Sequence, residues 1–538
     1  MARQLPIFPV RTDPVSPARL MELGKALFEI EDHRIEKADR RLLLRSGSHV
    51  VDMNVLSGGV WAADEAQLWN PDRKPQLVDE ERARAVAEDV LSRSALLPTF
   101  DEKDPFRVDF TTMGRTVASM RTGKGSPVVR TLDIQANFGV KVLLGDGEEV
   151  PVVGGGGEFN VILGDAGRVI GASGVWRPVE ERPLYSRMLD QDAADRVFFE
   201  QTRELKIDSF ESFLAYYAAP TPSTQTMLYP VRVYRASAVF DDTLVPLRLI
   251  TLPATEFGPF PKPEPRQKPR PKRDPRPPKP GPDEEPTRPR RTLANAAANP
   301  FEAGTSWIGE SGGLSGSKKN AKGFVDGLAA DGWLVNFNWG DANAWESDWR
   351  ANDDTYVDNA DFVFYTGHAN KDGWVLATPN DTFLHFNEIG GSPGNPGDLW
   401  GQQDLEWVIV AACGPLQDEL LSPGGGNVLS RWDGAFDGLH TLMGYGAITF
   451  DNEDEGKSVV AYARSGTPLI DAWFRAAKEI QPATNGESAP DGPTIWVGAM
   501  YVYKSGTTSP RNDHLWGHGS VAADPVAPNV QVCMWTTC

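Results

Sequence analysis

The C-terminal half of the chain alternates short apolar runs with segments of helical spacing. The helical segments are 321–330, 457–464 and 468–480, and the strand-like apolar runs are 332–337, 361–366, 405–412, 440–445 and 494–501, with 305–308 as a further first strand. Nearly continuous apolar strands that alternate with helices are typical of a parallel sheet covered on both faces. The pattern predicts an α/β fold with a parallel-type sheet and flanking helices.

The N-terminal half has a different order of elements. Strong helix formers predict a helix over 80–96. Strand-like runs follow it at 158–163, 168–170, 229–239 and 245–252, and helical patterns at 193–205 and 210–217 lie among them. The first two runs flank Gly164-Asp-Ala-Gly167, which favours a hairpin. We therefore predict an α+β domain over 1–257. It has no candidate nucleophile, which favours a regulatory or binding role, and its helix-then-hairpin order resembles the PepSY-type modules of protease propeptides.

A proline-rich stretch separates the two halves. Between Lys262 and Arg291 there are 11 Lys or Arg residues against 5 Asp or Glu. Frequent proline removes backbone donors and fixes φ, so we expect an extended, semi-rigid linker over 258–292, followed by a C-terminal domain over 293–538. Three roles remain open for it: a plain linker, a processing site cut at its exposed basic residues, or a ligand for polyproline-binding domains.

Composition limits the partners and the compartment. The formal net charge of −20 and the pI near 4.9 disfavour binding to phosphate backbones, so no nucleic-acid partner is expected. No apolar run approaches the roughly 20 residues of a membrane-spanning helix. The segment from Met1 to Val10 lacks the features of a secretory signal, so we expect a cytoplasmic protein or one exported without a classical signal. The oligomeric state is not indicated.

The candidate chemistry starts from the cysteines, which are only Cys413, Cys533 and Cys538. Three cysteines do not make a disulfide scaffold, and Cys413 stands alone in the interior of the sequence. It directly follows one apolar strand, and His368 follows another in the same way, 45 residues earlier. On neighbouring parallel strands the two side chains would face one crevice at the carboxyl ends. Nucleophilic cysteine catalysis uses an imidazole beside a thiolate.

These motifs carry a family resemblance. An apolar strand ending in Gly367-His368, a spacer of this length, and an apolar strand ending in Ala412-Cys413 resemble the caspase, gingipain, legumain and clostripain peptidases. The resemblance covers roughly residues 305–494 and implies a caspase-like sheet and cleavage of a polypeptide substrate through a thioester acyl-enzyme. It implies that Cys413 is the nucleophile and His368 the general acid/base. The backbone N–H of Cys413 and that of Ala369 would then stabilise the oxyanion.

The sequence departs from the family pattern at two places. Ala369 stands where the family usually has glycine, and Gly414-Pro415-Leu416 replaces a small polar run, with a proline that has no N–H to donate. The motifs also resemble a bacterial group of uncharacterised proteins with the same arrangement. Two alternatives stay open beside the peptidase: an inactive caspase-like binding or scaffold protein, which the concentration of tryptophan in the C-terminal half favours, and acyl transfer other than proteolysis.

Weaker signals concern pockets and metals. His440 and Asp361 are candidate pocket residues beside the crevice. Acidic clusters at 353–361 and 451–455 fit solvated loops, a calcium site, or a pocket that selects Arg or Lys in a substrate. No other metal is expected, because glycines interrupt the one short histidine pair, at 514 and 518. No organic cofactor is expected either.

Overall fold

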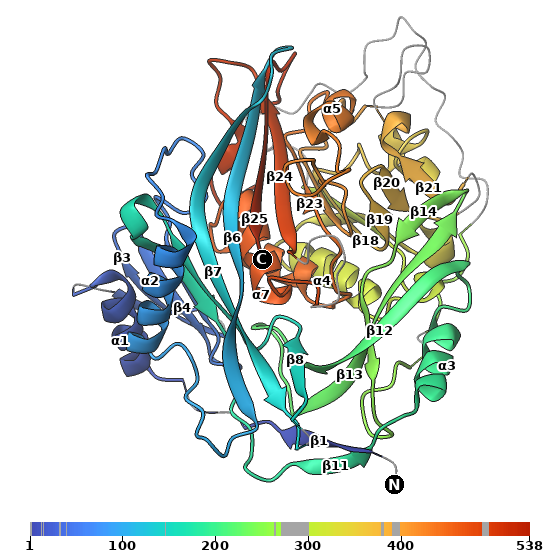
Figure 1. Ribbon diagram of the computed structural model, residues 1–538. Coiled ribbons are helices and arrows are strands. Elements are labelled where there is room, and N and C mark those ends of the chain that lie inside the picture. The colour runs from blue at the N-terminus through green and yellow to red at the C-terminus, as the bar shows by residue number, and fades with distance from the viewer. Residues whose placement is uncertain are drawn as a thin grey trace, which may run out of the picture.

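The computed structural model describes residues 3–11, 13, 15–31, 34–38, 40–145, 147–262, 265–270, 301–377, 381–389, 399–486 and 494–538. The fold is mixed α/β, with one large mixed sheet running through the molecule (Figure 1). The α-helices within these ranges are α1 (Pro17–Phe28), α2 (Glu80–Arg93), α3 (Gln191–Gln201), α4 (Ser317–Ala329), α5 (Val428–Trp432), α6 (Glu455–Arg464) and α7 (Leu469–Ile480). None of these helices combines the length and apolar character needed to cross a bilayer.

The C-terminal half contains the predicted parallel strands. Their order in the sheet is β17 (Leu334–Gly340), β16 (Glu302–Trp307), β18 (Phe362–Thr366), β22 (Trp407–Ala411) and β23 (Thr441–Tyr445), all parallel. The next strand, β24 (Trp496–Tyr503), runs antiparallel to β23, so the last strand predicted for the parallel-type sheet is not parallel. The fold class shown is therefore α/β with a mixed sheet.

The same sheet continues into the N-terminal half. Beyond β24 it consists of β25 (Val530–Thr537), β6 (Phe106–Thr122), β7 (Val128–Leu143), β9 (Glu158–Leu163), β10 (Val169–Gly174), β5 (Val60–Asp64), β4 (His49–Asn54), β3 (Arg41–Ser46) and β2 (Arg34–Ala38). The long hairpin of β6 and β7 lies alongside β25 and β24 (Figure 1). The two halves are thus joined by backbone hydrogen bonds as well as by the proline-rich segment.

A second group of N-terminal strands pairs around β13. It consists of β1 (Gln4–Pro9), β8 (Glu149–Val153), β11 (Leu184–Arg187), β12 (Ile207–Tyr217), β13 (Met227–Phe240), β14 (Thr243–Pro246) and β15 (Ile250–Pro253). The helix predicted over 210–217 was wrong, because these residues form β12, which pairs with β13 along almost its whole length. Aromatic residues at 210, 213, 216 and 217 suit a strand that has a partner. The predicted hairpin is confirmed as β9 and β10.

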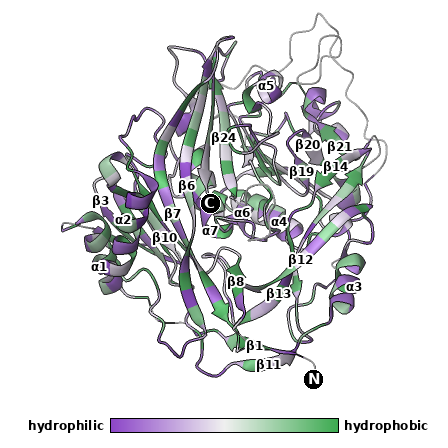
Figure 2. Cartoon of the chain, viewed as in Figure 1, coloured by the Kyte–Doolittle hydropathy of each residue, from purple (hydrophilic) through white to green (hydrophobic). Residues whose placement is uncertain are grey.

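Helix α2 illustrates why the N-terminal helices form. The Asp79 side chain accepts a hydrogen bond from the N–H of Arg82 and caps the helix, and acidic residues fill its first turn, where the helix dipole favours them. Its buried residues, Ala83, Ala87, Val90 and Leu91, recur at helical spacing. Figure 2 shows hydrophilic and hydrophobic residues alternating along α1, α2 and α3, as expected for helices that cover a sheet and face solvent.

Helix α7 binds the two halves together. Its Phe474 packs edge-on against Trp69, with ring centroids 5.3 Å apart. Arg475 forms an ion pair with Asp52 of β4 at 2.6 Å, and the Lys478 ammonium donates to the Gln135 side chain of β7 at 2.7 Å. A chain starting near residue 292 would lose these partners and expose the edge of β25. Activity tests therefore need the full chain.

The described part of the predicted linker has no helix or strand, as expected. Its residues 265–270 nevertheless lie on the C-terminal half. Arg270 binds both carboxylate oxygens of Asp348 at 2.7 Å, and its guanidinium lies 3.5 Å from the ring centroid of Trp345. Residues 271–292 of the predicted linker lie outside the described ranges.

Candidate active site

The two strand ends that carry His368 and Cys413 are neighbours. Strands β18 and β22 pair in parallel, and their last register pair is Thr366 with Ala411. His368 and Cys413 each follow two residues later, at the same edge of the sheet. The prediction that these residues lie at the carboxyl ends of adjacent parallel strands is confirmed. Both side chains are fully buried.

His368 is held by main-chain groups on both ring nitrogens. Nδ1 accepts a hydrogen bond from the N–H of Arg248 at 3.1 Å, so Nε2 carries the proton and donates it to the Gly312 carbonyl oxygen at 2.7 Å. Burial lowers the pKa of His368 to about 4, although the Gly312 carbonyl opposes that shift. The imidazole is therefore neutral at pH 7. Within the described ranges it has no hydrogen bond to Cys413.

Cys413 has a different set of neighbours. Its sulfur accepts from the N–H of Thr449 at 3.4 Å and lies 3.8 Å from the Thr449 hydroxyl oxygen. Burial raises the pKa of the thiol, and the positive charge of Arg248 opposes this only in part. The sulfur is thus a protonated thiol at neutral pH, which is a poor nucleophile.

The main chain beside the sulfur has free donors. Among the described residues, no acceptor is bound to the N–H of Cys413 or to that of Gly414. Gly414 has φ of +80°, a conformation that a side chain would strain. Free main-chain N–H groups are donors of the kind that can stabilise a negative oxygen. The second donor expected from sequence, Ala369, instead pairs with Trp374 in a hairpin of β19 (Ala369–Asn370) and β20 (Gly373–Val375). Ala369 does not line the cavity described below, whereas Gly414 does.

A buried arginine from the N-terminal half, Arg248, lies beneath this edge of the sheet. Its guanidinium donates to the Thr366 hydroxyl at 3.2 Å and to the Ala411 carbonyl at 2.8 Å. It also forms an ion pair with Glu455 at 3.0 Å, and both side chains are fully buried. Sequence reasoning missed this residue, because a single arginine between strand-like runs, 120 residues before His368, gives no signal of its position.

The segment around Arg248 covers the edge like an added strand. Leu249 pairs in parallel with Phe450, donating to the Thr449 carbonyl at 2.8 Å and accepting from the N–H of Asp451 at 3.0 Å. We call residues 246–250 the covering segment. It hydrogen-bonds to His368 on one side and to the Thr449 loop, which holds Cys413, on the other.

A cavity of about 600 Å³ opens beside Cys413. One wall comes from the C-terminal half, with Cys413, Gly414 and the ends of the strands that follow; the other comes from the N-terminal half, with residues of β6, β7 and the start of α2. The cavity thus lies between the halves, and Cys413 and Gly414 are among the residues that line it.

His440 and Asp361, expected beside the crevice, lie at the opposite edge of the sheet. Asp361 directly precedes β18, where its carboxylate accepts from the N–H of Glu302 at 2.6 Å. His440 directly precedes β23 and forms an ion pair with Asp513 at 2.6 Å. In a parallel sheet, residues that precede the strands lie at one edge of the sheet, and residues that follow the strands lie at the opposite edge. We therefore remove both residues from the candidate pocket.

His440 makes stability depend on pH. Burial alone would lower its pKa, but the Asp513 and Asp524 carboxylates outweigh this and raise the pKa to about 9. Its contribution is present below pH about 6.5 and is lost as pH rises through 9. We expect the free energy of unfolding to fall by about 3 kcal/mol from this group over that range. Urea unfolding at pH 6.5 and 9.5 should show a smaller fall for His440→Gln than for the unchanged chain; equal falls would contradict this assignment.

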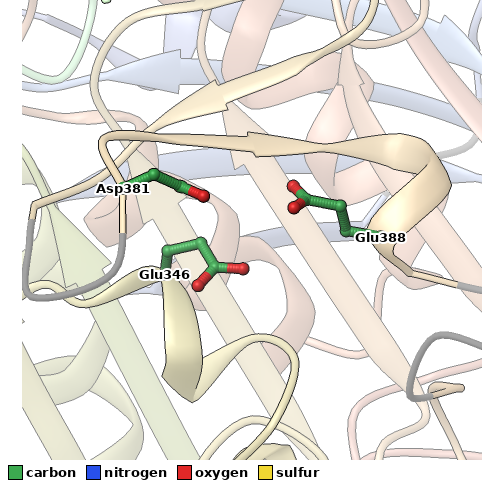
Figure 3. A group of neighbouring side chains, drawn as sticks. All are labelled: Glu346, Asp381 and Glu388. Carbon is green, nitrogen blue, oxygen red and sulfur yellow. The ribbon is translucent and has the colours of Figure 1, made fainter. Parts of the chain in front are cut away.

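Three carboxylates gather away from the Cys413 cavity. Glu346, Asp381 and Glu388 have oxygens within 4.8 Å of one another (Figure 3). Burial raises the pKa of Glu346 and that of Asp381. Arg350 forms ion pairs with Glu346 and Glu388, so the group already has a positive partner. In the clusters considered for calcium, Asp358, Asp451 and Glu455 likewise bind main-chain N–H groups or Arg248.

Comparison with known proteins adds one family. Residues 302–538 match a family described as a domain of unknown function (DUF6345). The match starts at the first residue of β16 and includes the strands that carry His368 and Cys413. The N-terminal half, with Arg248 and its cavity wall, lies outside it. No curated protein matches the chain.

Proposed function

We propose that the protein is a cysteine peptidase, with Cys413 as nucleophile and His368 as general acid/base, held in a latent state by the covering segment. The observation that carries the proposal is the placement of His368 and Cys413 at equivalent positions beyond the paired ends of β18 and β22. The free N–H groups of Cys413 and Gly414, two residues that line the cavity, support it.

The reaction would proceed through a thioester. Nδ1 of His368 takes the proton of the Cys413 thiol, and the resulting thiolate attacks the carbonyl carbon of the scissile peptide bond. The two free N–H groups donate to the oxygen that becomes negative. Protonated His368 gives its proton to the leaving amine as the C–N bond breaks. Water then attacks the thioester, which releases the new carboxylic acid and returns the sulfur.

The covering segment accounts for latency. The Arg248 N–H occupies His368 Nδ1, so this nitrogen cannot exchange a proton with sulfur or substrate while the segment is in place. The low pKa of His368 and the raised pKa of Cys413 both favour the neutral, unreactive pair. Displacement of residues 246–250 would free Nδ1 and hydrate both groups, which moves each pKa toward its ordinary value.

An inactive scaffold is the second candidate. The full burial of both His368 and Cys413 favours it, as does the Arg248–Glu455 pair, which ties the covering segment firmly into the core. In that case the two residues would only fill space at a strand end, as buried cysteine and histidine often do.

Thiol labelling in the full chain tests the proposal. Cys413, Cys533 and Cys538 are all buried, so the last two report global unfolding within the same molecule. With an iodoacetamide probe in increasing urea, we expect Cys413 to react at concentrations well below those that expose Cys533 and Cys538, because the covering segment opens locally. We expect His368→Ala to slow that early reaction at pH 7. Labelling of all three cysteines together would overturn the latent-peptidase proposal and favour the scaffold.

A further inference from the structure

Residues 265–270 of the proline-rich stretch lie against the C-terminal half without forming a helix or a strand. The Gln267 side chain binds two main-chain groups of β17. Its Nε2 donates to the Asn338 carbonyl at 3.1 Å, and its Oε1 accepts from the N–H of Gly340 at 2.9 Å. The segment is therefore held to the end of β17 by hydrogen bonds that the C-terminal half supplies from its main chain.

Asn343 holds the main chain of the same segment. Its Oδ1 accepts from the N–H of Arg270 at 3.0 Å, and its Nδ2 donates to the Lys268 carbonyl at 2.8 Å. Pro269, between these two residues, has no N–H to satisfy. A side-chain amide that pairs with both a C=O and an N–H of a passing chain holds that chain as a neighbouring strand would, whatever its side chains are.

The Arg270 side chain enters a cage of aromatic rings with a carboxylate. Its guanidinium lies 3.5 Å from the ring centroid of Trp345, 4.9 Å from that of Trp339 and 5.2 Å from that of Tyr356. Its Nη2 donates to both carboxylate oxygens of Asp348 at 2.7 Å, and the Asp348 side chain is fully buried. Aromatic faces and a carboxylate together recognise a planar cation. We call these four residues the arginine cage.

Arg270 is held less completely than Arg248, the buried arginine beneath the candidate active site. All three nitrogens of the Arg248 guanidinium have an acceptor, whereas Nε and Nη1 of Arg270 have none among the described residues. Unsatisfied buried donors reduce the net gain from holding an arginine in place. This difference favours Arg270 as an occupant that can leave its site, and Arg248 as a fixed part of the core.

The sequence offers the cage more than one possible occupant. A proline followed by an arginine occurs four times in the proline-rich stretch, at 265–266, 269–270, 275–276 and 289–290. The cage residues and Asn343 all come from the C-terminal half, so the receiving surface and its occupant are separate parts of the chain. Proline before the arginine fixes φ and lowers the entropy that such a segment loses on binding.

We propose that this groove is a binding site for polypeptide segments that carry proline followed by arginine. Residues 265–270 are its tethered occupant, and a Pro-Arg segment of another polypeptide can take their place. The inference goes beyond the proposed function and does not depend on it, because no residue of the arginine cage lines the cavity beside Cys413. Arginine is preferred to lysine, since only a guanidinium both stacks on the rings and meets two carboxylate oxygens in one plane.

Peptide binding to the full chain tests this inference. In the emptied chain, residues 265–270 are replaced by alternating glycine and serine, which keeps the linker length. The probe is a fluorescein-labelled peptide with the sequence of 265–270, Pro-Arg-Gln-Lys-Pro-Arg, followed by fluorescence anisotropy at about 0.15 M salt to screen attraction by net charge. We expect saturable binding to the emptied chain. Binding to the unchanged chain should be at least about 10-fold weaker, because its own segment competes at a local concentration on the order of millimolar.

Variants of the cage and of the peptide identify the site. In the emptied chain, Asp348→Asn should weaken binding at least about 10-fold, whereas Asp354→Asn, at an exposed carboxylate, should change it less than about 3-fold. A peptide with lysine in place of its last arginine should bind at least about 10-fold more weakly.

Four results would overturn the proposal and leave residues 265–270 as a fixed part of the fold. They are no saturable binding to the emptied chain, equal binding to the emptied and unchanged chains, binding that survives Asp348→Asn, and equal binding of the lysine peptide. If the emptied chain has no cooperative thermal transition, the same comparisons are made with Arg270→Gln, which vacates only the cage. None of these results bears on the reactivity of Cys413, which the labelling experiment measures separately.

Discussion

Replacing Cys413 by alanine is expected to abolish peptide hydrolysis once the covering segment has been displaced. We choose Leu249→Pro to displace the covering segment, because proline removes the N–H that donates to the Thr449 carbonyl at 2.8 Å. In this background we expect release of peptides from casein. Adding Cys413→Ala should lower the rate by at least about 10³-fold, since no other group supplies the nucleophile.

His368 and a second cysteine serve as references for this prediction. Adding His368→Ala should lower hydrolysis by about 10²–10⁴-fold, the range of general acid–base catalysis. Cys533→Ala should leave it unchanged, because Cys533 is buried on β25, away from the cavity. If Leu249→Pro does not fold, hydrolysis is measured with the unchanged chain instead, at urea concentrations where only Cys413 is labelled. Hydrolysis that persists without Cys413, or none in either opened form, contradicts the peptidase assignment.

Replacing Arg248 by methionine is expected to lower the free energy of unfolding by about 3–5 kcal/mol. Methionine has a similar length, so the main loss is the charge that faces the fully buried Glu455 at 3.0 Å. Glu455 keeps hydrogen bonds from Tyr445, Asn320 and Gln481, but these are neutral donors that compensate a buried carboxylate incompletely. Urea unfolding at pH 7, followed by circular dichroism, measures the change.

Two further variants separate the charge effect from lost packing. Arg248→Met with Glu455→Gln should recover part of the stability, because the unpaired carboxylate is gone. Arg84→Met breaks an ion pair with Glu88, 2.8 Å apart, in which both side chains are about half exposed, and should cost less than about 1 kcal/mol. A loss below about 1 kcal/mol for Arg248→Met would show that the buried pair does not anchor the covering segment.

The sequence can predict at which edge of the sheet a residue lies. This prediction was right for two of the candidate residues and wrong for two others. His368 and Cys413 follow apolar strands and lie at the carboxyl edge. Asp361 and His440 precede strands, and the same rule would have placed them at the amino edge, where they lie. Predicting them as pocket residues gave more weight to their chemical type than to their position along the strand.

The cavity beside Cys413 shows the limit of sequence reasoning more clearly. One of its walls, and Arg248 near it, come from the half of the chain in which the sequence indicated no candidate site residue. The N-terminal wall of the cavity is in place because β6 pairs with β25. Such pairing depends on contacts between residues some 400 positions apart, which leave no local pattern.

The sequence by itself determined the alternation of strands and helices and the delivery of His368 and Cys413 to one sheet edge, because strand formation and burial leave a short-range apolar pattern. Only the tertiary structure decided which groups contact His368 and Cys413 at that edge. Whether the imidazole faces sulfur or the Arg248 N–H, and which charges surround the thiol, depend on the long-range packing of the N-terminal half against the sheet. The same packing sets the pKa of each group, because burial and neighbouring charge are properties of the folded chain.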